Sequence, residues 1–593
     1  MPSAPVTSDI GLVTFTISVA GKAVESSMEI LFVETHKAVG KIPSARIIIA
    51  DAGPSEGTFP LSNASTFVPG NDVEIKLGYH STEKTIFKGI IVKHGVRVYQ
   101  NKAAISIDCR DKAIKMTMGR KNAFFEKKTD DAIIKKLIGD NGLTPYVGSL
   151  SIAHPFFIQH QISDWDLTMM RAEANGFVVV VDDGKVTVKE PQTSASAICK
   201  LCFGDSILDM HIEVDARTQI KKAKAFSWDT ATQANLSGDS QSTGPTTPGN
   251  LTSSKLAGVL GLSQYEMRTS AGLTQSELSK WASGKLLKAE LSKVKGKVSF
   301  PGNASVKPGS MVELEGLGDR LNGTCYVGAV TQRLEDGTWI TEAQLGLDFE
   351  WFVEELPNVQ PPDAAALMPA LKGMHSGVVA NIHEDPDGSY KVKVMLPLLG
   401  DTAYVWARFA NFYASNNAGI GFFPEINDEV IVAFLNEDPR YAVVLGSIYG
   451  SKHTPPIPPA KDNPIKGIST VNKLKLLFKD KDKIIEISTP DGNTITMDNA
   501  KGITIEDKHK NKIEMSSAGI IIDSAKDINI TANKGNIKMS GLNIEIDAKT
   551  SFKAKSLKIE AEAQTQLKMA GNAQAELSSG GQTVVKGSIV QIN

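Results

Sequence analysis

Residues 483–593 fall into a short repeat that constrains the fold more than any other feature of the chain. Each unit spans about eight residues, with apolar residues at positions i and i+2 followed by Gly, Asn, Ser, Ala or Asp. Ile495 and Ile503 are eight residues apart, as are Ile505 and Ile513. Side chains that alternate between two faces, with a turn after each short strand, are typical of a β-helix or β-solenoid.

The size of the repeat bears on the number of chains in this β-helix. A single chain with units this short would coil too tightly to enclose a core. Three chains wrapped together solve this problem, because each supplies one face of a triangular prism and pairs its strand edges with its neighbours. We therefore expect a homotrimeric, intertwined β-helix, with outward Lys, Glu, Asp and Asn. Its expected core comprises Ile503, Ile505, Ile513, Ile522, Ile528, Ile530, Ile537, Ile544, Ile546 and Ile559. A monomeric solenoid or an adhesin stalk remains the alternative.

Residues 1–195 predict a first strand-rich lobe with two inserted helices. The first helix follows Thr129 and carries an apolar stripe at helical spacing, formed by Ile133, Ile134, Leu137 and Ile138.

The second helix of this lobe begins at Ser163, the expected N-cap, and ends at Gly176. Asp164 and Asp166 could be taken for catalytic carboxylates. Their place in the first turn, next to the positive end of the helix dipole, favours a capping role instead. Leu167, Met170 and Ala174 are expected on the inward face.

Residues 196–365 predict a second strand-rich lobe. Residues 229–254 are polar and rich in Gly, Ser, Thr and Pro, which favours a flexible loop. A capping box of Thr274 and Glu277 then precedes a helix near 275–294. Cys199 and Cys202 form a CxxC pair, but the alternating sequence around them indicates a strand, so we interpret them as structural cysteines.

Residues 372–450 contain five short strands separated by turns, which fits an OB-type barrel. Trp406, Phe409, Phe412 and Tyr413 cluster here with only Arg408 beside them. An oligonucleotide site would place more basic residues among the aromatics, so we expect core and interface packing. Residues 451–482 read as a proline-rich connector.

Residues 418–449 resemble the signature stretch of VgrG-type spike proteins of contractile injection systems. The matching positions include Gly419, Pro424, Asp428, Glu429, Val430, Asp438, Pro439 and Gly446. Residues 86–95, the helix that begins at Ser163, and residues 488–505 are similar to further parts of that family. Three positions depart from its pattern: Asn427 and Glu437 stand where Gly is frequent, and Ala442 where Pro is frequent.

The resemblance implies a fused hub and needle. The two lobes would supply six near-equivalent units in a trimer, which suits docking on a hexameric inner tube protein next to baseplate proteins. Sheath contraction would then drive the needle through a target membrane. A PAAR-like tip protein is expected to cover the apolar end, Ser588, Ile589, Val590, Gln591, Ile592 and Asn593. Effector cargo is possible in this family, whereas residues 450–466 leave no room for a lysozyme domain.

Bulk properties limit the remaining functions. The formal net charge is −2, which argues against a nucleic-acid partner. The first residues lack the pattern of a signal peptide, so we expect synthesis in the cytoplasm and export as part of an injection particle. No GxSxG, HExxH, Walker loop or Cys/His cluster indicates catalysis, a metal or a cofactor, so we expect a protein that is not an enzyme. A trimeric tail fibre or adhesin, and a hydrolase hidden in residues 196–300, remain alternatives. The sequence leaves open whether the machine is a type VI system or an extracellular phage-tail-like particle.

Overall fold

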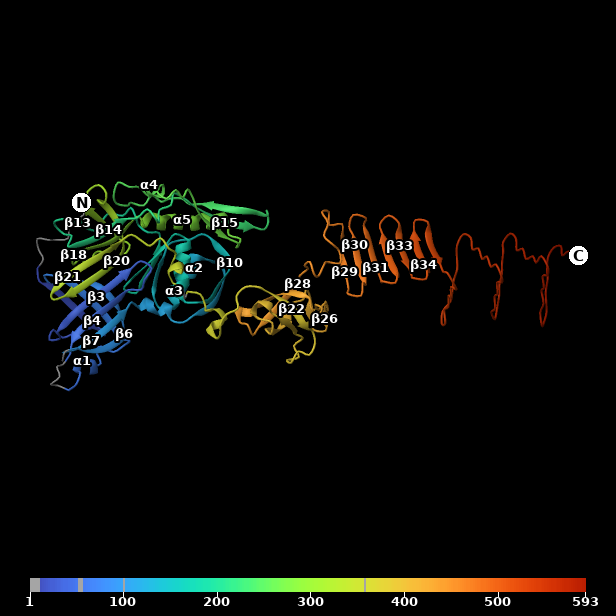
Figure 1. Ribbon diagram of the computed structural model, residues 1–593, viewed down its shortest axis with the longest axis horizontal. Coiled ribbons are helices and arrows are strands. Elements are labelled where there is room, and N and C mark those ends of the chain that lie inside the picture. Colours follow the sequence, from blue (N-terminus) through green and yellow to red (C-terminus); the bar gives the residue numbers. More distant parts are fainter. Residues whose placement is uncertain (1–10, 52–56, 100–101, 357–358, 593) are drawn as a thin grey trace. The chain divides into compact units, whose positions relative to one another are not determined.

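The computed structural model describes residues 11–51, 57–99, 102–356 and 359–592 (Figure 1). Two compact units divide the chain between Ile448 and Tyr449. Strands dominate both units, which confirms the mainly β fold class predicted from the sequence. None of the described helices has the length and hydropathy needed to cross a membrane.

A thirteen-stranded sheet joins the two lobes of the hub. Strand β3 of the first lobe pairs along its length with β20 of the second, with Thr35 opposite Gln332 and Ala38 opposite Ala329. The strands of this sheet are β1 Val13–Val19, β2 Lys22–Ala23, β3 Ile30–Ala38, β4 Ser44–Ala50, β5 Asp72–Tyr79, β6 Thr82–Tyr99, β7 Lys102–Arg110, β13 Lys200–Cys202, β14 Asp209–Val214, β18 Val294–Pro301, β19 Met311–Glu315, β20 Gly323–Glu335 and β21 Thr338–Leu345. The ladder between lobes is a long-range pairing that no local pattern encodes.

The remaining elements of the hub are short helices and small sheets. The helices are α1 Pro60–Asn63, α2 Asp130–Asp140, α3 Asp164–Ala174, α4 Ser253–Ala257, α5 Gln275–Leu291 and α6 Phe352–Glu355, with 3-10 turns at Lys112–Thr117 and Asp363–Ala366. The small sheets contain β8 Lys121–Thr129, β9 Thr144–Val147, β10 Ala153–Ile162, β11 Val178–Asp182, β12 Lys185–Lys189, β15 Ala223–Asp229, β16 Ala234–Asp239 and β17 Tyr265–Thr269.

Helix α3 begins as predicted, since the Ser163 hydroxyl accepts the backbone N–H of Asp166 at 3.0 Å. Asp164 is buried and ties several elements together. It accepts hydrogen bonds from the Asn141 and Gln159 side-chain amides and forms an ion pair with Lys121. Burial alone would raise the pKa of this carboxyl, but the three donors more than offset that effect and lower the pKa. Its role is therefore structural.

The predicted inward face of α3 is only partly right. Leu167 is buried, whereas Met170 and Ala174 are half-buried; Met169 and Ala172 occupy the core in their place. The helix is rotated relative to the expectation because it packs against both α2 and α5. The stripe of α2 is buried as predicted.

The prediction of a flexible loop over residues 229–254 is wrong in its central part. Strand β16 lies within it and pairs with β15 from Lys224 to Asp229. The segment that follows is held by the buried Lys293, whose ammonium donates to the carbonyls of Pro248 at 2.8 Å and Leu251 at 2.9 Å. The polar composition of this segment gave no sign that it is ordered, because Lys293, which anchors it, lies about 40 residues further along the chain.

The predicted capping box of α5 is present. Thr274 accepts the backbone N–H of Glu277, and the Glu277 carboxylate accepts the backbone N–H of Thr274. The cysteines are also as expected, with Cys199 and Cys202 free on either end of β13. Burial raises the pKa of the Cys199 thiol to about 11, so this side chain stays protonated at neutral pH.

Residues 375–447 form a closed five-stranded barrel, which confirms the OB-type prediction. Its strands are β22 His375–Asn381, β23 Val392–Met395, β24 Tyr404–Phe409, β27 Glu429–Phe434 and β28 Ala442–Ser447, with the small β25 Ala414–Ser415 and β26 Ala418–Gly419 between them and 3-10 turns at Pro397–Leu399 and Leu435–Glu437. Phe412 is 98% exposed, so it does not pack into this barrel as core.

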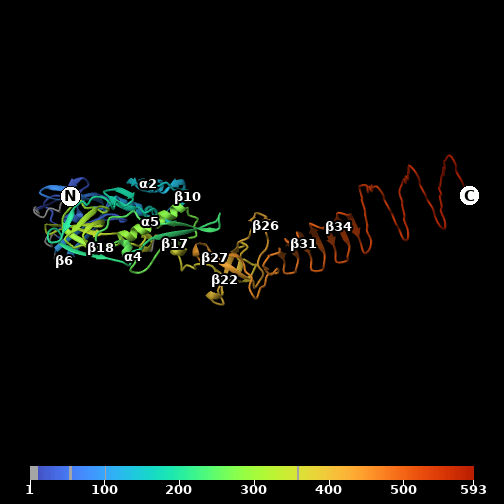
Figure 2. The same cartoon turned by 90° about the horizontal axis from the view of Figure 1, so that it is seen from above.

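The second unit begins with a seven-stranded antiparallel meander, drawn in orange in Figure 2. Its strands are β29 Ile465–Ser469, β30 Lys475–Lys479, β31 Ile484–Ser488, β32 Thr494–Asp498, β33 Gly502–Glu506, β34 Lys512–Ser516 and β35 Gly519–Asp523. The first two strands lie inside the predicted connector, so regular structure starts earlier than the repeat suggested. In the described residues after Asp523 the chain zigzags without any strand of its own (Figure 1).

The anchored loop after β16 gives a first prediction. Replacing Lys293 by Met removes the donor from the buried carbonyl of Pro248 and the partly buried carbonyl of Leu251, so we expect the free energy of unfolding of the hub to fall by about 1–3 kcal/mol. Amide hydrogen exchange in residues 240–252 should speed up. The matched control is Lys295→Met, which removes a half-exposed ion pair with Asp348 and should change stability by less than about 1 kcal/mol. Unchanged exchange in the loop of the Lys293 variant would show that the ammonium does not hold it.

Candidate assembly interface

Two apolar ladders cross one face of the meander. Alternation within each strand and the antiparallel register together put these side chains in columns. The first ladder consists of Ile468, Leu476, Ile487, Ile495, Ile505, Ile513 and Ile522, and the second of Phe478, Ile485, Met497, Ile503, Met515 and Ile520. The opposite face carries mainly polar side chains, including Glu486, Thr496, Thr504 and Glu514. The sheet is therefore amphipathic.

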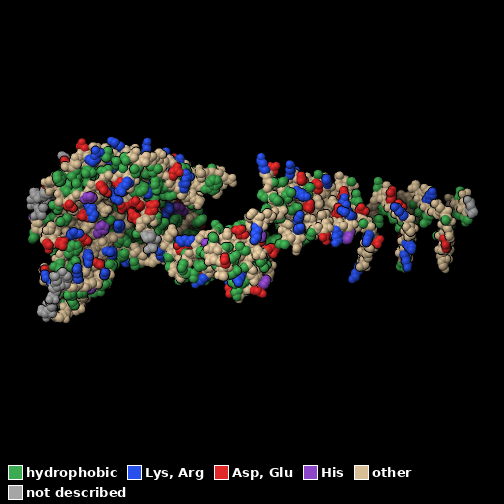
Figure 3. Space-filling model, in the orientation of Figure 1, with side chains coloured by type: hydrophobic (Ala, Val, Ile, Leu, Met, Phe, Trp, Pro, Cys, Tyr) green, Lys and Arg blue, Asp and Glu red, His purple; other side chains and the backbone are tan. Residues whose placement is uncertain are grey.

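Among the described residues of this unit, none buries the apolar face. Ile495 and Ile513 are each 36% exposed and Ile487 is 46% exposed. None of the described residues from 449 to 592 is buried, so this unit has no core of its own within one chain. In Figure 3, hydrophobic side chains are visible at its surface among Lys, Asp and Glu. A continuous apolar face of this kind, exposed to water, favours association with a partner.

A groove of about 510 Å³ runs beside the first ladder. Ile487, Ile495, Ile505, Ile513 and Ile522 line it, together with polar residues of the loops at one edge, such as Asn493 and Asn511. An apolar floor with a polar rim is the arrangement expected of a protein–protein contact.

The loops at this edge share one construction. Thr489 and Asn493 close one loop, and Asp507 and Asn511 close the next, each pair through a hydrogen bond between their backbones at 3.0 Å. Asparagine side chains then link successive loops. The Asn493 carbonyl oxygen accepts the backbone N–H of Lys508 at 3.1 Å, and that of Asn511 accepts the backbone N–H of Ala525 at 3.1 Å.

The ten predicted core residues divide at Asp523. Ile503, Ile505, Ile513 and Ile522 lie in the ladders. The other six belong to the segment without strands, and all are more than half exposed in the single chain: Ile528, Ile530, Ile537, Ile544, Ile546 and Ile559. The eight-residue spacing identifies only some neighbours within the meander. Ile505 pairs with Ile513 as the spacing suggests, whereas Ile495 pairs with Ile487 and Ile505 rather than with Ile503. Ile468, Leu476 and Phe478 were missed, although alternation in their two strands could have revealed them.

The predicted tip residues 588–592 lie in the same extended segment. Ile589 is 83% exposed and Ile592 is 91% exposed, while Asn593 lies outside the described residues. The contact of residues 588–593 with a PAAR-like tip protein therefore stays a prediction.

The signature residues of the barrel serve the barrel itself. Val430 is fully buried, and Asp428 accepts the backbone N–H of Glu425 at 2.9 Å. Asp438 binds the Arg440 guanidinium, which holds the pKa of that carboxyl below its ordinary value. Gly419 has φ of +151°, and a Cβ there would lie 2.5 Å from the carbonyl oxygen of Tyr413, so only glycine fits. Pro424 lies in the loop before β27, and Glu429 is the first residue of that strand. Pro439 lies in the hairpin between β27 and β28, and Gly446 lies within β28, opposite Ile431.

Two departures from the family pattern fall on left-handed backbone. Asn427 has φ of +76° and Glu437 has φ of +59°. Glycine adopts this region freely, asparagine tolerates it, and a glutamate is strained there. The left-handed backbone at Asn427 and Glu437 thus explains why the family pattern has glycine at both positions.

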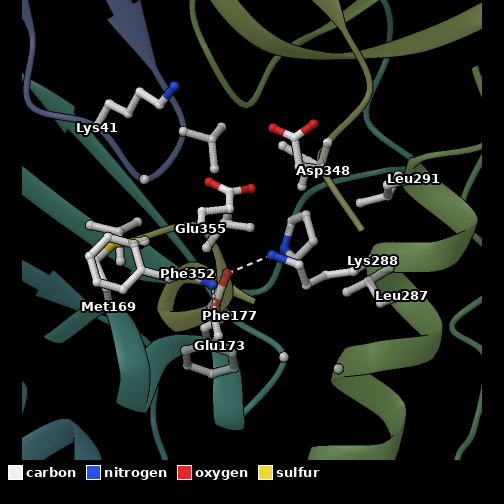
Figure 4. Close-up of a pocket in the computed structure, with 18 of the residues that line it drawn as sticks. Lys41, Met169, Glu173, Phe177, Leu287, Lys288, Leu291, Asp348, Phe352 and Glu355 are labelled. Atoms are coloured by element: carbon white, nitrogen blue, oxygen red, sulfur yellow. Dashed lines mark hydrogen bonds and ion pairs between the residues drawn. The ribbon is translucent and has the colours of Figure 1, made fainter. Parts of the chain in front are cut away.

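The hub contains a separate cavity of about 470 Å³ (Figure 4). Met169, Phe177, Leu287, Leu291 and Phe352 form its apolar wall. Glu173 lies at its side, where it binds Lys288 at 2.6 Å and accepts the backbone N–H of Phe352 at 2.7 Å, so helices α3, α5 and α6 meet here.

A group of three carboxylates lies near the mouth of this cavity. Asp348, Glu350 and Glu355 are all exposed, and they are the one such group of potential metal ligands among the described residues. Exposed acidic groups commonly lack a metal, and Asp348 is already paired with Lys295. These three residues lie outside residues 196–300, so the predicted hydrolase alternative stays untested.

Three family models match the chain. The Alg8 N-terminal domain covers residues 9–336, the type VI secretion system/phage-baseplate injector OB domain covers residues 375–449, and the phage baseplate V C-terminal trimerisation domain covers residues 484–552. The last two fall on the barrel and on the ladders, and they confirm the resemblance to VgrG-type spike proteins. No curated protein matches the chain.

Several solved structures are similar at low identity. A Neisseria meningitidis tail protein is 14% identical with a TM-score of 0.43, over 57% of this chain and 98% of that one. An Escherichia coli type VI secretion system component, described as similar to the T4 bacteriophage tail proteins gp27 and gp5, is 14% identical with a TM-score of 0.35, over 73% and 99%. A chain of the Francisella PdpA–VgrG complex is 11% identical with a TM-score of 0.39, over 83% and 88%. These values are too low to carry function across.

The strained turn of the barrel gives a second prediction. Glu437→Gly should raise the free energy of unfolding by about 0.5–1 kcal/mol, because the relief of a left-handed non-glycine residue exceeds the entropy lost by glycine. Thermal unfolding monitored at the barrel measures this change. Glu437→Gln removes the charge but keeps the strain, so it should leave stability nearly unchanged. Equal stabilisation by both variants would assign the effect to charge instead.

Proposed function

The chain belongs to the family of the Alg8 N-terminal domain and is a VgrG-type spike protein, and we propose that three copies form the central spike of a contractile injection machine. One observation carries this proposal most directly. Two apolar ladders lie uncovered in a segment that matches a trimerisation domain, and that segment has no core within one chain. Three copies around a common axis bury the ladders against each other and leave the polar face in water.

The hub fits the docking role in this proposal. Its two lobes are each built on strands of a shared sheet, and the core of the first lobe also includes Leu334 and Trp339 of the second. Three chains then offer six strand-rich units, which suits a hexameric inner tube protein. Baseplate proteins complete the site in the particle.

The work of such a spike is mechanical, and no reacting group is required of the chain. Force from a contracting sheath passes along strands that are held by hydrogen bonds between neighbours and resist bending. The needle would then pierce the membrane of the target cell. Delivery inside a particle also accounts for export, and effectors can travel with the spike.

The apolar residues near position 590 call for a partner. Three copies of Ile589, Val590 and Ile592 form a small apolar surface that would promote aggregation if left bare. A PAAR-like protein with a matching apolar base is the partner we propose for it.

Imaging of assembled particles tests the spike itself. With an epitope tag inserted in the exposed loop at Asp387–Gly388, we expect label in threefold arrangement at one end of the tube, inside the baseplate. Label along the fibres, or none on the particle, would contradict the proposal and favour a fibre or adhesin.

The cap gives a further prediction. Changing Ile589 and Ile592 together to Asp should weaken binding of a PAAR-like protein at least about tenfold, because it buries charge in an apolar contact. Titration by calorimetry measures this affinity. Lys586→Asp alters charge beside the tip without altering its apolar surface and should have little effect. Equal binding by both variants would exclude the tip as the capping site.

A further inference from the structure

The second unit changes character at a single point in the chain. From Ile465 to Asp523 every strand pairs with the next strand of the same chain. In residues 524–592 no strand pairs within the chain (Figure 2), although the apolar repeat of the sequence continues. One half of the needle can therefore form its backbone hydrogen bonds before any partner arrives, and the other half cannot.

Asn511 marks the point where the chain leaves its own sheet. Its side-chain oxygen accepts the Ser524 hydroxyl at 2.8 Å and the backbone N–H of Ala525 at 3.1 Å. Asp507 in turn fixes the Asn511 side chain through a hydrogen bond at 2.8 Å. The residues directly after β35 are thus held in place by the preceding loop.

We propose that the meander β29–β35 is the nucleus that sets the register of the trimer, and that the segment 524–592 wraps afterwards, from the base of the needle towards its tip. This inference rests on the proposed trimer and adds an order of assembly to it. Asn511 acts as a positioning residue that directs each chain from its own sheet onto its neighbours.

Entropy favours this order. Three unpaired segments that meet at random lose the conformational freedom of every residue before any contact is complete. Three preformed sheets have already lost that freedom, and each presents a continuous apolar face in one register. Once they dock, the segments after Ser524 start side by side, and each further strand adds pairing at a low cost of closure.

Paired substitutions in the full chain test the order. Ile495→Asp with Ile505→Asp places charge in neighbouring rungs of the first ladder. We expect the concentration for half-dissociation of the trimer to rise about a hundredfold or more, by sedimentation equilibrium. Thr496→Asp with Thr504→Asp puts the same charges on the polar face of the same two strands and should leave the trimer intact. If the ladder variant remains as trimeric as this control, the meander is not the nucleus.

Substitutions after residue 524 give the opposite expectation, namely that the trimer survives. Ile530→Asp with Ile546→Asp should leave a trimer, while hydrogen exchange increases after residue 524 and stays slow in residues 465–523. Loss of the trimer as complete as in the ladder variant would overturn the inference while leaving the proposed function standing. A native chain that is itself monomeric would refute the proposed function instead.

Hydrogen exchange of the unmodified trimer in rising denaturant tests the order of assembly without any substitution. Residues 524–592 should exchange at lower denaturant than residues 465–523, with the trimer still intact. Asn511→Ala should widen this gap, because the segment loses its starting point, whereas Asn543→Ala in the distal segment should not. Simultaneous opening of both halves would contradict assembly from the base.

Discussion

The uncovered apolar face of the meander is the constraint on which the rest of this protein depends. Strand pairing within the meander forms the backbone hydrogen bonds between its neighbouring strands but leaves ladder side chains such as Ile495 and Ile505 facing water. Hydrophobic burial then has to come from other copies, because no described residue of the second unit is buried. The oligomer is thus built into the pattern of alternation.

The hub reaches its stability by a different route. Its cores are enclosed within one chain, and the β3–β20 ladder makes the two lobes one continuous sheet. Buried charges such as Asp164 and Lys293 hold the connections between elements through several hydrogen bonds each. A self-contained base suits the proposed role of the hub, in which it would transmit load to the needle.

Local patterns predicted much of this structure and failed where distant residues decide. The caps at Ser163 and Thr274, the stripe of α2 and the five barrel strands all follow from neighbours in sequence, and the structure has them. Strand β16 was hidden in polar sequence that Lys293 and α5 hold from afar. In the needle, the repeat predicted apolar residues of the ladders but only part of their register, because loops of unequal length separate the paired strands. The tip and its partner lie beyond what one chain can reveal.

The molar mass of the intact chain in solution tests the central claim most directly. Sedimentation equilibrium at micromolar concentration should give three times the 63.6 kDa of the chain, with no dissociation on dilution to the nanomolar range. A mass of one chain at these concentrations would contradict the account, since the ladders would then be stable in water without a partner.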